Sequence, residues 1–410
     1  MNKQIFVAAL AMPLALSSAF AQEAQDLTVK VSGFGTGALT WTNTDQAEFG
    51  RPNQVRGANK SPTTGVDSNL GLQADVTVNN WLSFTGQGLV RKDAEDDFGA
   101  DLTWAFAKAR INDQFSVRIG RIGMPAFMIS DYRNVGYANT FLRAPVEMYS
   151  QVPYNDLDGI DATYQHSFGD TTVTAQLGFG RTEADIAVGL TGKGRKVKAL
   201  NLVAEHGPFT LRFGHLTADV TITGATSIDG LLNRLRAASV GYGLPQLNTM
   251  ADQIEARDKK ATFTSLGLAM DWKNVVAQSE FAKRKTHSYV NDTTSWYVMG
   301  GYRFGKVLPY VIHSKLSIDK FPANAIPADT TNPMLAALGA GASILPYNGS
   351  GQGEQATTSV GVRWDFHSSL ALKAQIDRVK PGVGKGLLLN AQPGFNRDVT
   401  VGAVALDFVF

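Results

Sequence analysis

The sequence predicts an all-β protein, a closed antiparallel transmembrane β-barrel of about 16 strands with short turns at one end and long loops at the other. Bulky apolar and polar residues alternate along many segments, most clearly from Ser359 to Val379. A period of two residues is the signal of a strand with two different faces. The connections between these segments alternate between short and long, and aromatic residues recur beside the short ones.

The alternating segments follow one another along nearly the whole chain. The first runs from Leu27 to Trp41, and the last ends at Phe410. We expect strands near residues 27–42, 67–79, 81–92, 102–111, 115–121, 159–168, 172–180, 196–205, 209–217, 260–270, 275–284, 295–304, 307–315, 356–366, 370–378 and 398–410.

The connections indicate how these strands are arranged. Short turns such as Asn79–Asn80 alternate with long segments after Trp41, Arg121, Thr217 and Lys315. A chain that runs up and down, with turns at one end and loops at the other, is typical of an outer-membrane barrel.

Aromatic residues mark the turn end of the predicted barrel. They lie on the apolar side of the alternation, next to a short turn or the C-terminus: Phe115, Phe168, Phe209, Phe304, Phe366 and Phe410. Such a ring is the interfacial girdle of a membrane barrel. The apolar face would therefore contact lipid, and the polar face would line a lumen too wide for side chains to fill.

Composition and the N-terminal segment narrow the class of protein. Only 18% of the 410 residues are charged and the net charge is +2, which argues against a nucleic-acid partner. The chain has no cysteine. Lys3, the apolar run from Ile5 to Leu16 and the sequence Ala19-Phe20-Ala21 predict a secretory signal peptide over residues 1–21, followed by the barrel over residues 22–410.

Three phrases give the chain a family resemblance. "GVRWDF" from Gly361, "LALKAQIDR" from Leu370 and the terminal "VALDFVF" stand in order near the C-terminus. With the signal peptide and the strand pattern, they make the chain resemble the general porins of Gram-negative bacteria. That resemblance implies a homotrimer in the outer membrane, surrounded by lipid and lipopolysaccharide, that passes small hydrophilic solutes and ions passively. It also implies that the third long loop narrows the lumen.

The loop over about residues 122–158 matches that loop in position. We expect its acids to line the narrowest part of the lumen: Asp131, Glu147, Asp156 and Asp158. The alternation turns several bases of the first five strands inward: Lys30, Arg91, Lys108, Arg110 and Arg118, with Arg121 turned inward by a bulge. Bases facing acids would set a field across the constriction. The alternative is that these bases are solvated or paired locally.

Small residues face outward on the first, third and fourth strands: Gly33, Gly35, Gly37, Gly86, Gly88, Ala105, Ala107 and Ala109. Because small residues allow another wall to approach closely, we expect the homotrimer to form through the first five strands. Contact with lipid alone is the alternative. Two segments inside long loops, 228–238 and 332–341, have a helical pattern.

Two other functions remain open. A substrate-selective channel would use the aromatic residues of the long loop, which include Tyr132, Tyr149 and Tyr154. An enzyme is not expected, because none of the six histidines lies in a recognisable catalytic motif and metal ligands at useful spacing are absent. We therefore expect no cofactor.

Overall fold

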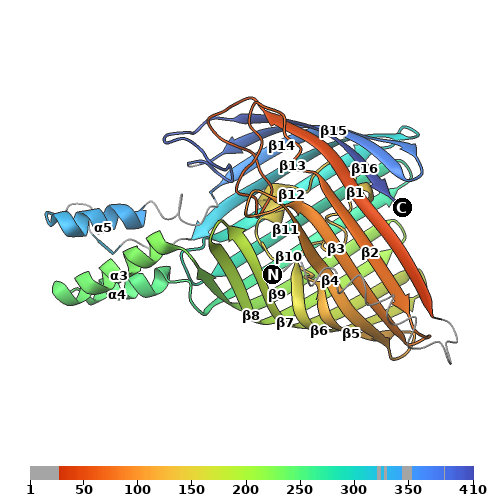
Figure 1. Cartoon of the computed structure of the whole chain (residues 1–410), viewed down its shortest axis with the longest axis horizontal. Helices are drawn as coiled ribbons and strands as arrows, with labels where there is room; N and C mark the ends of the chain where they lie inside the picture. The colour runs from red at the N-terminus through yellow and green to blue at the C-terminus, as the bar shows by residue number, and fades with distance from the viewer. Residues whose placement is uncertain (1–26, 321–324, 327–329, 344–352, 383) are drawn as a thin grey trace.

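The chain forms one closed antiparallel barrel in which each strand pairs with its neighbours in sequence and β1 pairs with β16 (Figure 1). The computed structural model describes residues 27–320, 325–326, 330–343, 353–382 and 384–410. The predicted signal peptide lies outside these residues. Closure leaves no unpaired sheet edge, as a barrel in lipid requires.

The described residues form sixteen strands, as the alternation predicts. Their bounds are β1 Thr28–Thr42, β2 Asn69–Thr77, β3 Leu82–Lys92, β4 Phe98–Arg110, β5 Phe115–Gly123, β6 Asp156–Phe168, β7 Thr171–Ala187, β8 Leu190–His206, β9 Phe209–Thr223, β10 Lys259–Trp272, β11 Val275–Thr286, β12 Asp292–Tyr302, β13 Val307–Lys320, β14 Gln355–His367, β15 Leu370–Pro381 and β16 Val399–Val409.

The loops opposite the short turns all lie at the same end of the barrel. Those used below are the long loops L1 (43–68), L3 (124–155), L5 (224–258) and L8 (382–398), and the shorter loop L6 (287–291). Within the described residues, five helices lie in the loops: η1 Gly136–Ala138 and α2 Val146–Tyr149 in L3, α3 Thr226–Gly241 and α4 Pro245–Ile254 in L5, and α5 Pro333–Ser343 before β14.

Helices α3, α4 and α5 project together beyond the strand ends (Figure 1). Two of them confirm the helical segments expected near 228–238 and 332–341. Their apolar faces pack on one another around Leu235, Met250 and Leu338. Among the described residues, none of the helices has the length and hydropathy needed to cross a membrane.

The two faces of the wall differ as the alternation predicts. Large apolar side chains point outward and stay exposed, for example Leu177 at 61% and Ile376 at 62%. The neighbouring residues Gln176 and Gln375 point inward and are buried. In water this apolar outer face would be unfavourable, and lipid is the surrounding that suits it.

The glycines of β1 have a different role from the one expected. An ideal Cβ on Gly33 would lie 2.2 Å from the ring of Phe410, and one on Gly35 would lie 2.5 Å from the ring of Phe408. The chain's own C-terminal aromatic rings therefore cover these two glycines, and their small size allows β1 and β16 to close the barrel. Gly37 and Gly86 remain open on the outer face.

The main apolar core lies inside the barrel, between L3 and the wall. L3 contributes Phe127, Phe141 and Met148, and the wall contributes side chains such as Phe263 and Tyr297. Phe127 packs edge-on against Phe263, with ring centroids 5.3 Å apart. The Met, Phe and Tyr content of L3 is thus explained by packing inside the lumen, which confirms the expected position of this loop.

Candidate functional site

L3 narrows the lumen, and a set of buried polar contacts holds it against β9–β16. These contacts determine which charges remain free to meet a solute. Each of them joins a side chain or a carbonyl of L3 to a residue of the wall or of L1.

Glu147 of α2 is one of these anchors. Its side chain is only 1% exposed, and its carboxylate accepts hydrogen bonds from Ser314 Oγ at 2.8 Å, Gln355 Nε2 at 2.7 Å and Thr357 Oγ1. The expectation that Glu147 lines the water-filled constriction is therefore wrong. A charged residue in a loop normally faces water, but here three neutral donors from β13 and β14 replace the water.

Arg143 is the second anchor. It lies between two carboxylates, with Nη2 2.6 Å from Asp67 Oδ2 of L1 and Nη1 bonded to Asp377 of β15. Its guanidinium also lies over the ring of Phe49, 4.8 Å from the centroid. Burial disfavours the charged form of Asp67, but the charge of Arg143 outweighs this and lowers the pKa of that carboxyl. The arrangement ties L1, L3 and the wall together.

Lys373 of β15 is the third anchor. Its ammonium donates to the carbonyls of Gly136, Asn139 and Phe141 at 2.6–3.0 Å and pairs with Asp407 at 2.9 Å. One wall lysine thus stabilises the turn around η1, in addition to the Asn139 N–H that donates to the Gly136 carbonyl and the Arg363 Nη1 that donates to the Asn139 carbonyl.

Glu280 and Arg212 hold the other part of L3. Glu280 of β11 accepts hydrogen bonds from the backbone N–H of Met128 and from the hydroxyl of Tyr149, both at 2.6 Å. Arg212 of β9 donates to the carbonyls of Pro125 and Ala126 at 2.6 and 3.2 Å. Both ends of L3 are therefore fixed to the wall by charged groups.

Arg118 of the wall and Asp131 of L3 were both expected to face the lumen. Arg118 of β5 is held by Asp161 through Nε at 3.0 Å and Nη2 at 2.5 Å. Asp131 is exposed on L3 beside Gly123, close enough to act electrostatically on Arg118. Asp161 of the wall is thus the ion-pair partner of Arg118, and Asp131 of L3 adds a longer-range electrostatic interaction.

Arg121 and Asp158 lie on the other side of the wall. They pair across β5 and β6 at 2.7 Å, and Asp156 lies 4.0 Å from the same guanidinium. The ladder runs without a register shift from Arg118 to Ile122, whose side chain is in the interior core. Alternation therefore puts Arg121 and Asp158 on the outer face, and the expected inward bulge is wrong.

The other predicted wall bases lie along the lower part of the lumen. Lys108 stands opposite Arg118 in the ladder, and Lys30 stands opposite Asp75. Arg110 is exposed at the turn end of β4. Within the described residues, none of these three bases forms an ion pair shorter than 4.0 Å with an acid.

Three arginines form a cluster that crosses the lumen between L1, β3 and L3. Arg91 of β3 was expected on the wall, and Arg51 of L1 and Arg133 of L3 join it, with the three guanidinium groups close enough to repel one another. Burial and then the charges of Arg91 and Arg51 lower the pKa of Arg133, but a guanidinium stays charged at neutral pH. In the part of the chain that the structure describes, none of the three is in a salt bridge.

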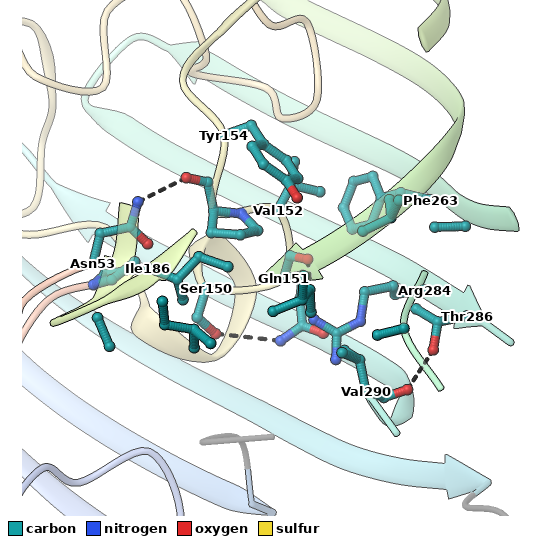
Figure 2. A pocket seen from close by; sticks show the side chains of 18 of the residues that line it. Asn53, Ser150, Gln151, Val152, Tyr154, Ile186, Phe263, Arg284, Thr286 and Val290 are labelled. Carbon is teal, nitrogen blue, oxygen red and sulfur yellow. Dashed lines mark hydrogen bonds between the residues drawn. The ribbon is translucent and has the colours of Figure 1, made fainter. Parts of the chain in front are cut away.

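A cavity of about 580 Å³ opens beside this cluster. L3 forms one wall through Ser150–Tyr154, and β7–β11 with L1, L6 and L8 form the rest. Figure 2 shows Arg284 next to Gln151, whose carbonyl accepts from Arg284 Nη1 at 3.1 Å. Asn53 of L1 also lines the cavity, and its Nδ2 donates a hydrogen bond to the Pro153 carbonyl of L3 at 2.8 Å. Among the described residues, no group of three potential metal ligands is found.

The comparisons with known proteins agree with this architecture. The chain is similar to OmpT, an outer-membrane protein of Vibrio cholerae, with a TM-score of 0.53 at 12% identity over 95% of this chain and 99% of that one. It is similar to the trimer form of in-vitro folded OmpT, with a TM-score of 0.53 at 13% identity over 94% and 100%.

Salmonella typhi OmpF, solved in complex with daunomycin, gives a TM-score of 0.53 at 12% identity over 93% of this chain and 97% of that one. No family model and no curated protein matches the sequence. At these identities the likeness shows the fold, which is that of an outer-membrane β-barrel.

Proposed function

We propose that this chain is an outer-membrane porin that forms a water-filled channel, through which small hydrophilic solutes and ions diffuse passively. The observation that carries the proposal is L3, which is fixed inside the barrel by Glu147, Arg143 and Lys373. A loop anchored in this way narrows the lumen to a defined opening, which is how such barrels set the size and charge of what passes.

We propose further that the channel assembles as a homotrimer through the outer face of β1–β5. Gly37, Gly86 and Ala107 leave this face shallow, and the Arg121–Asp158 ion pair lies on it. An outward-facing ion pair is costly in lipid and is better placed against a second polypeptide wall. Elsewhere the apolar outer face would meet lipid, and the loop end would meet lipopolysaccharide.

A substrate-selective channel is the second candidate. The cavity beside L3 favours it, because a general channel needs no pocket lined by apolar side chains. Both candidates are non-enzymatic, and a lipase and protease assay on the folded barrel is expected to show no turnover.

Conductance across a planar lipid bilayer tests the proposal. The purified protein is expected to insert in steps of three and to give a current that rises linearly with KCl concentration. A protein that inserts without conductance would contradict the channel function, whereas single rather than triple steps would contradict the trimer alone.

A further inference from the structure

The cavity between L3 and the wall has walls that suit an apolar molecule. Side chains from five regions supply this surface: Val152 of L3, Ile186, Leu190, Val197, Leu216, Val220 and Phe263 from β7–β10, Val188 between β7 and β8, Tyr289 and Val290 of L6, and Leu387 and Leu389 of L8. A volume of about 580 Å³ is in the range of sites for small organic ligands. A fully hydrophilic solute has no apolar surface to bury and would gain no free energy from contact with these walls.

The charges around the cavity are all of one sign. Its described lining contains four bases, Arg51, Lys259, Arg284 and Lys385, and no acidic side chain. Within the described residues, none of these four forms a salt bridge. Four positive charges in the lining of an apolar cavity, with no acid in its described lining, attract an anion and repel a cation.

Neutral carbonyls hold two of these bases in place. Arg284 is 7% exposed and donates to the carbonyls of Gln151 at 3.1 Å and Asn291 at 2.9 Å, while its Nε finds no hydrogen-bond partner among the described residues. Lys259 donates to the carbonyl of Asp252 at 2.8 Å. Because a carbonyl positions a cation without neutralising it, the positive charge stays available to a bound molecule.

The acids that act on these bases lie outside the described lining of the cavity. Asp67 acts on Arg51 and Asp292 acts on Arg284, but neither forms a salt bridge with the base among the described residues. Burial lowers the pKa of the Lys385 ammonium. Arg51 connects the cavity to the cluster with Arg91 and Arg133, so that positive charge continues toward the constriction.

From these features we propose that the cavity binds amphipathic organic anions, such as aromatic or aliphatic carboxylates, whose apolar body lies on the valine and leucine walls and whose carboxylate faces the bases. This deepens the proposed channel function and rests on it, since the cavity would be a solute site on the path. Inorganic anions should bind more weakly because they have no apolar body for the valine and leucine walls. Neutral analogues have no negative charge for the bases, and organic cations carry a positive charge that the bases repel.

The test compares four probes of matched shape or charge: 2-naphthoate, its neutral amide, the corresponding ammonium compound 2-naphthylmethylamine, and acetate. Block of the KCl current is recorded in a planar bilayer, and binding to the same protein in detergent is measured by calorimetry. We expect saturable block and binding by 2-naphthoate, with the other three weaker by about tenfold or more.

Variants locate the site. The double variant Arg51→Gln/Lys385→Gln is expected to weaken 2-naphthoate by about tenfold. Val188→Glu places a carboxylate at the exposed rim of the cavity, and it is also expected to weaken the binding of 2-naphthoate because like charges repel. Lys193→Gln removes a base of β8 that pairs with Glu183 outside the cavity, and it is expected to change nothing. A circular dichroism spectrum in detergent that keeps the wild-type β-sheet signal shows that each variant is folded.

The outcomes separate the two proposals. Equal affinity for the amide and the carboxylate, or an unchanged affinity in both cavity variants, overturns the anion site even if the protein conducts. Absence of KCl conductance overturns the channel function, and calorimetry then still decides whether the cavity binds the anion.

Discussion

The charged residues on the two sides of L3 differ in whether they have partners of opposite charge. On the side that packs against β11–β16, acids such as Glu147 and Asp377 are buried in hydrogen bonds and ion pairs that fix the loop. On the side that faces the cavity, Arg51 and Arg284 form no salt bridge within the described residues. A chain with a net charge of only +2 can therefore present a basic path, because the described lining of the cavity has four bases and no acid.

The largest effect is expected from Arg143→Met on the anchored side. It leaves Asp67 and Asp377 buried without a counter-charge, which costs about 3–5 kcal/mol of the free energy of unfolding. Urea unfolding in detergent measures the loss, and current noise is expected to rise as L3 comes loose. The triple variant Asp67→Asn/Arg143→Met/Asp377→Asn is expected to recover most of the stability. An Arg143→Met protein as stable and quiet as the wild type would contradict the anchoring role.

A smaller loss is expected from Glu147→Leu. The change removes the acceptor for Ser314, Gln355 and Thr357, and leaving buried donors unsatisfied costs about 1–3 kcal/mol. Asp131→Asn is the matched control, since it neutralises an exposed acid of the same loop and is expected to cost less than about 0.5 kcal/mol. Equal losses in the two variants would show that Glu147 is not a special contact.

Acidification is expected to loosen the anchored side alone. The folded-state pKa of Asp67 is lowered, so its contribution to stability is present above the unfolded value of about 3.9 and is lost as the pH falls through the folded value. Current noise from L3 is thus expected to stay constant from pH 7 to 5 and to rise only below about pH 4. Asp67→Asn should lack this step, and an onset near pH 6 would point to another group.

The smallest change in stability is expected from Arg133→Gln at the arginine cluster. Because no ion pair is broken within the described residues, the free energy of unfolding should change by less than about 0.5 kcal/mol. The reversal potential in a KCl gradient, however, should move toward the equilibrium potential of potassium, because the channel loses a positive charge. Arg257→Gln, which removes an exposed base of L5 away from the cavity, is expected to move it little. A large loss of stability with no shift in the reversal potential would mean that Arg133 stabilises the fold and does not act on passing ions.

The barrel could be predicted from the sequence because each strand carries its own signal. The upper parts of β7 and β8 were missed, since register shifts at Gly180/Thr182 and Arg195/Lys198 break the alternation there. Helix α4 was also missed, although Leu247, Met250, Ala251 and Ile254 have helical spacing and are buried.

The candidate site could be predicted only in part. Strand parity found Arg91 and Arg118, but it says nothing about loop residues such as Arg51. Glu147 was expected in water because its three partners are 167–210 residues away in sequence, and only the folded chain brings them together. Arg121 was wrongly turned inward because the sequence does not show that the ladder through β5 and β6 keeps its register.

The reversal potential of the wild-type channel in a KCl gradient tests the central claim most directly. If acids hold L3 while the bases of the cavity and the arginine cluster stay free, chloride passes more readily than potassium, and the potential has the sign of an anion-preferring channel. A potential of the opposite sign would mean that the acids, and not the bases, face the solute.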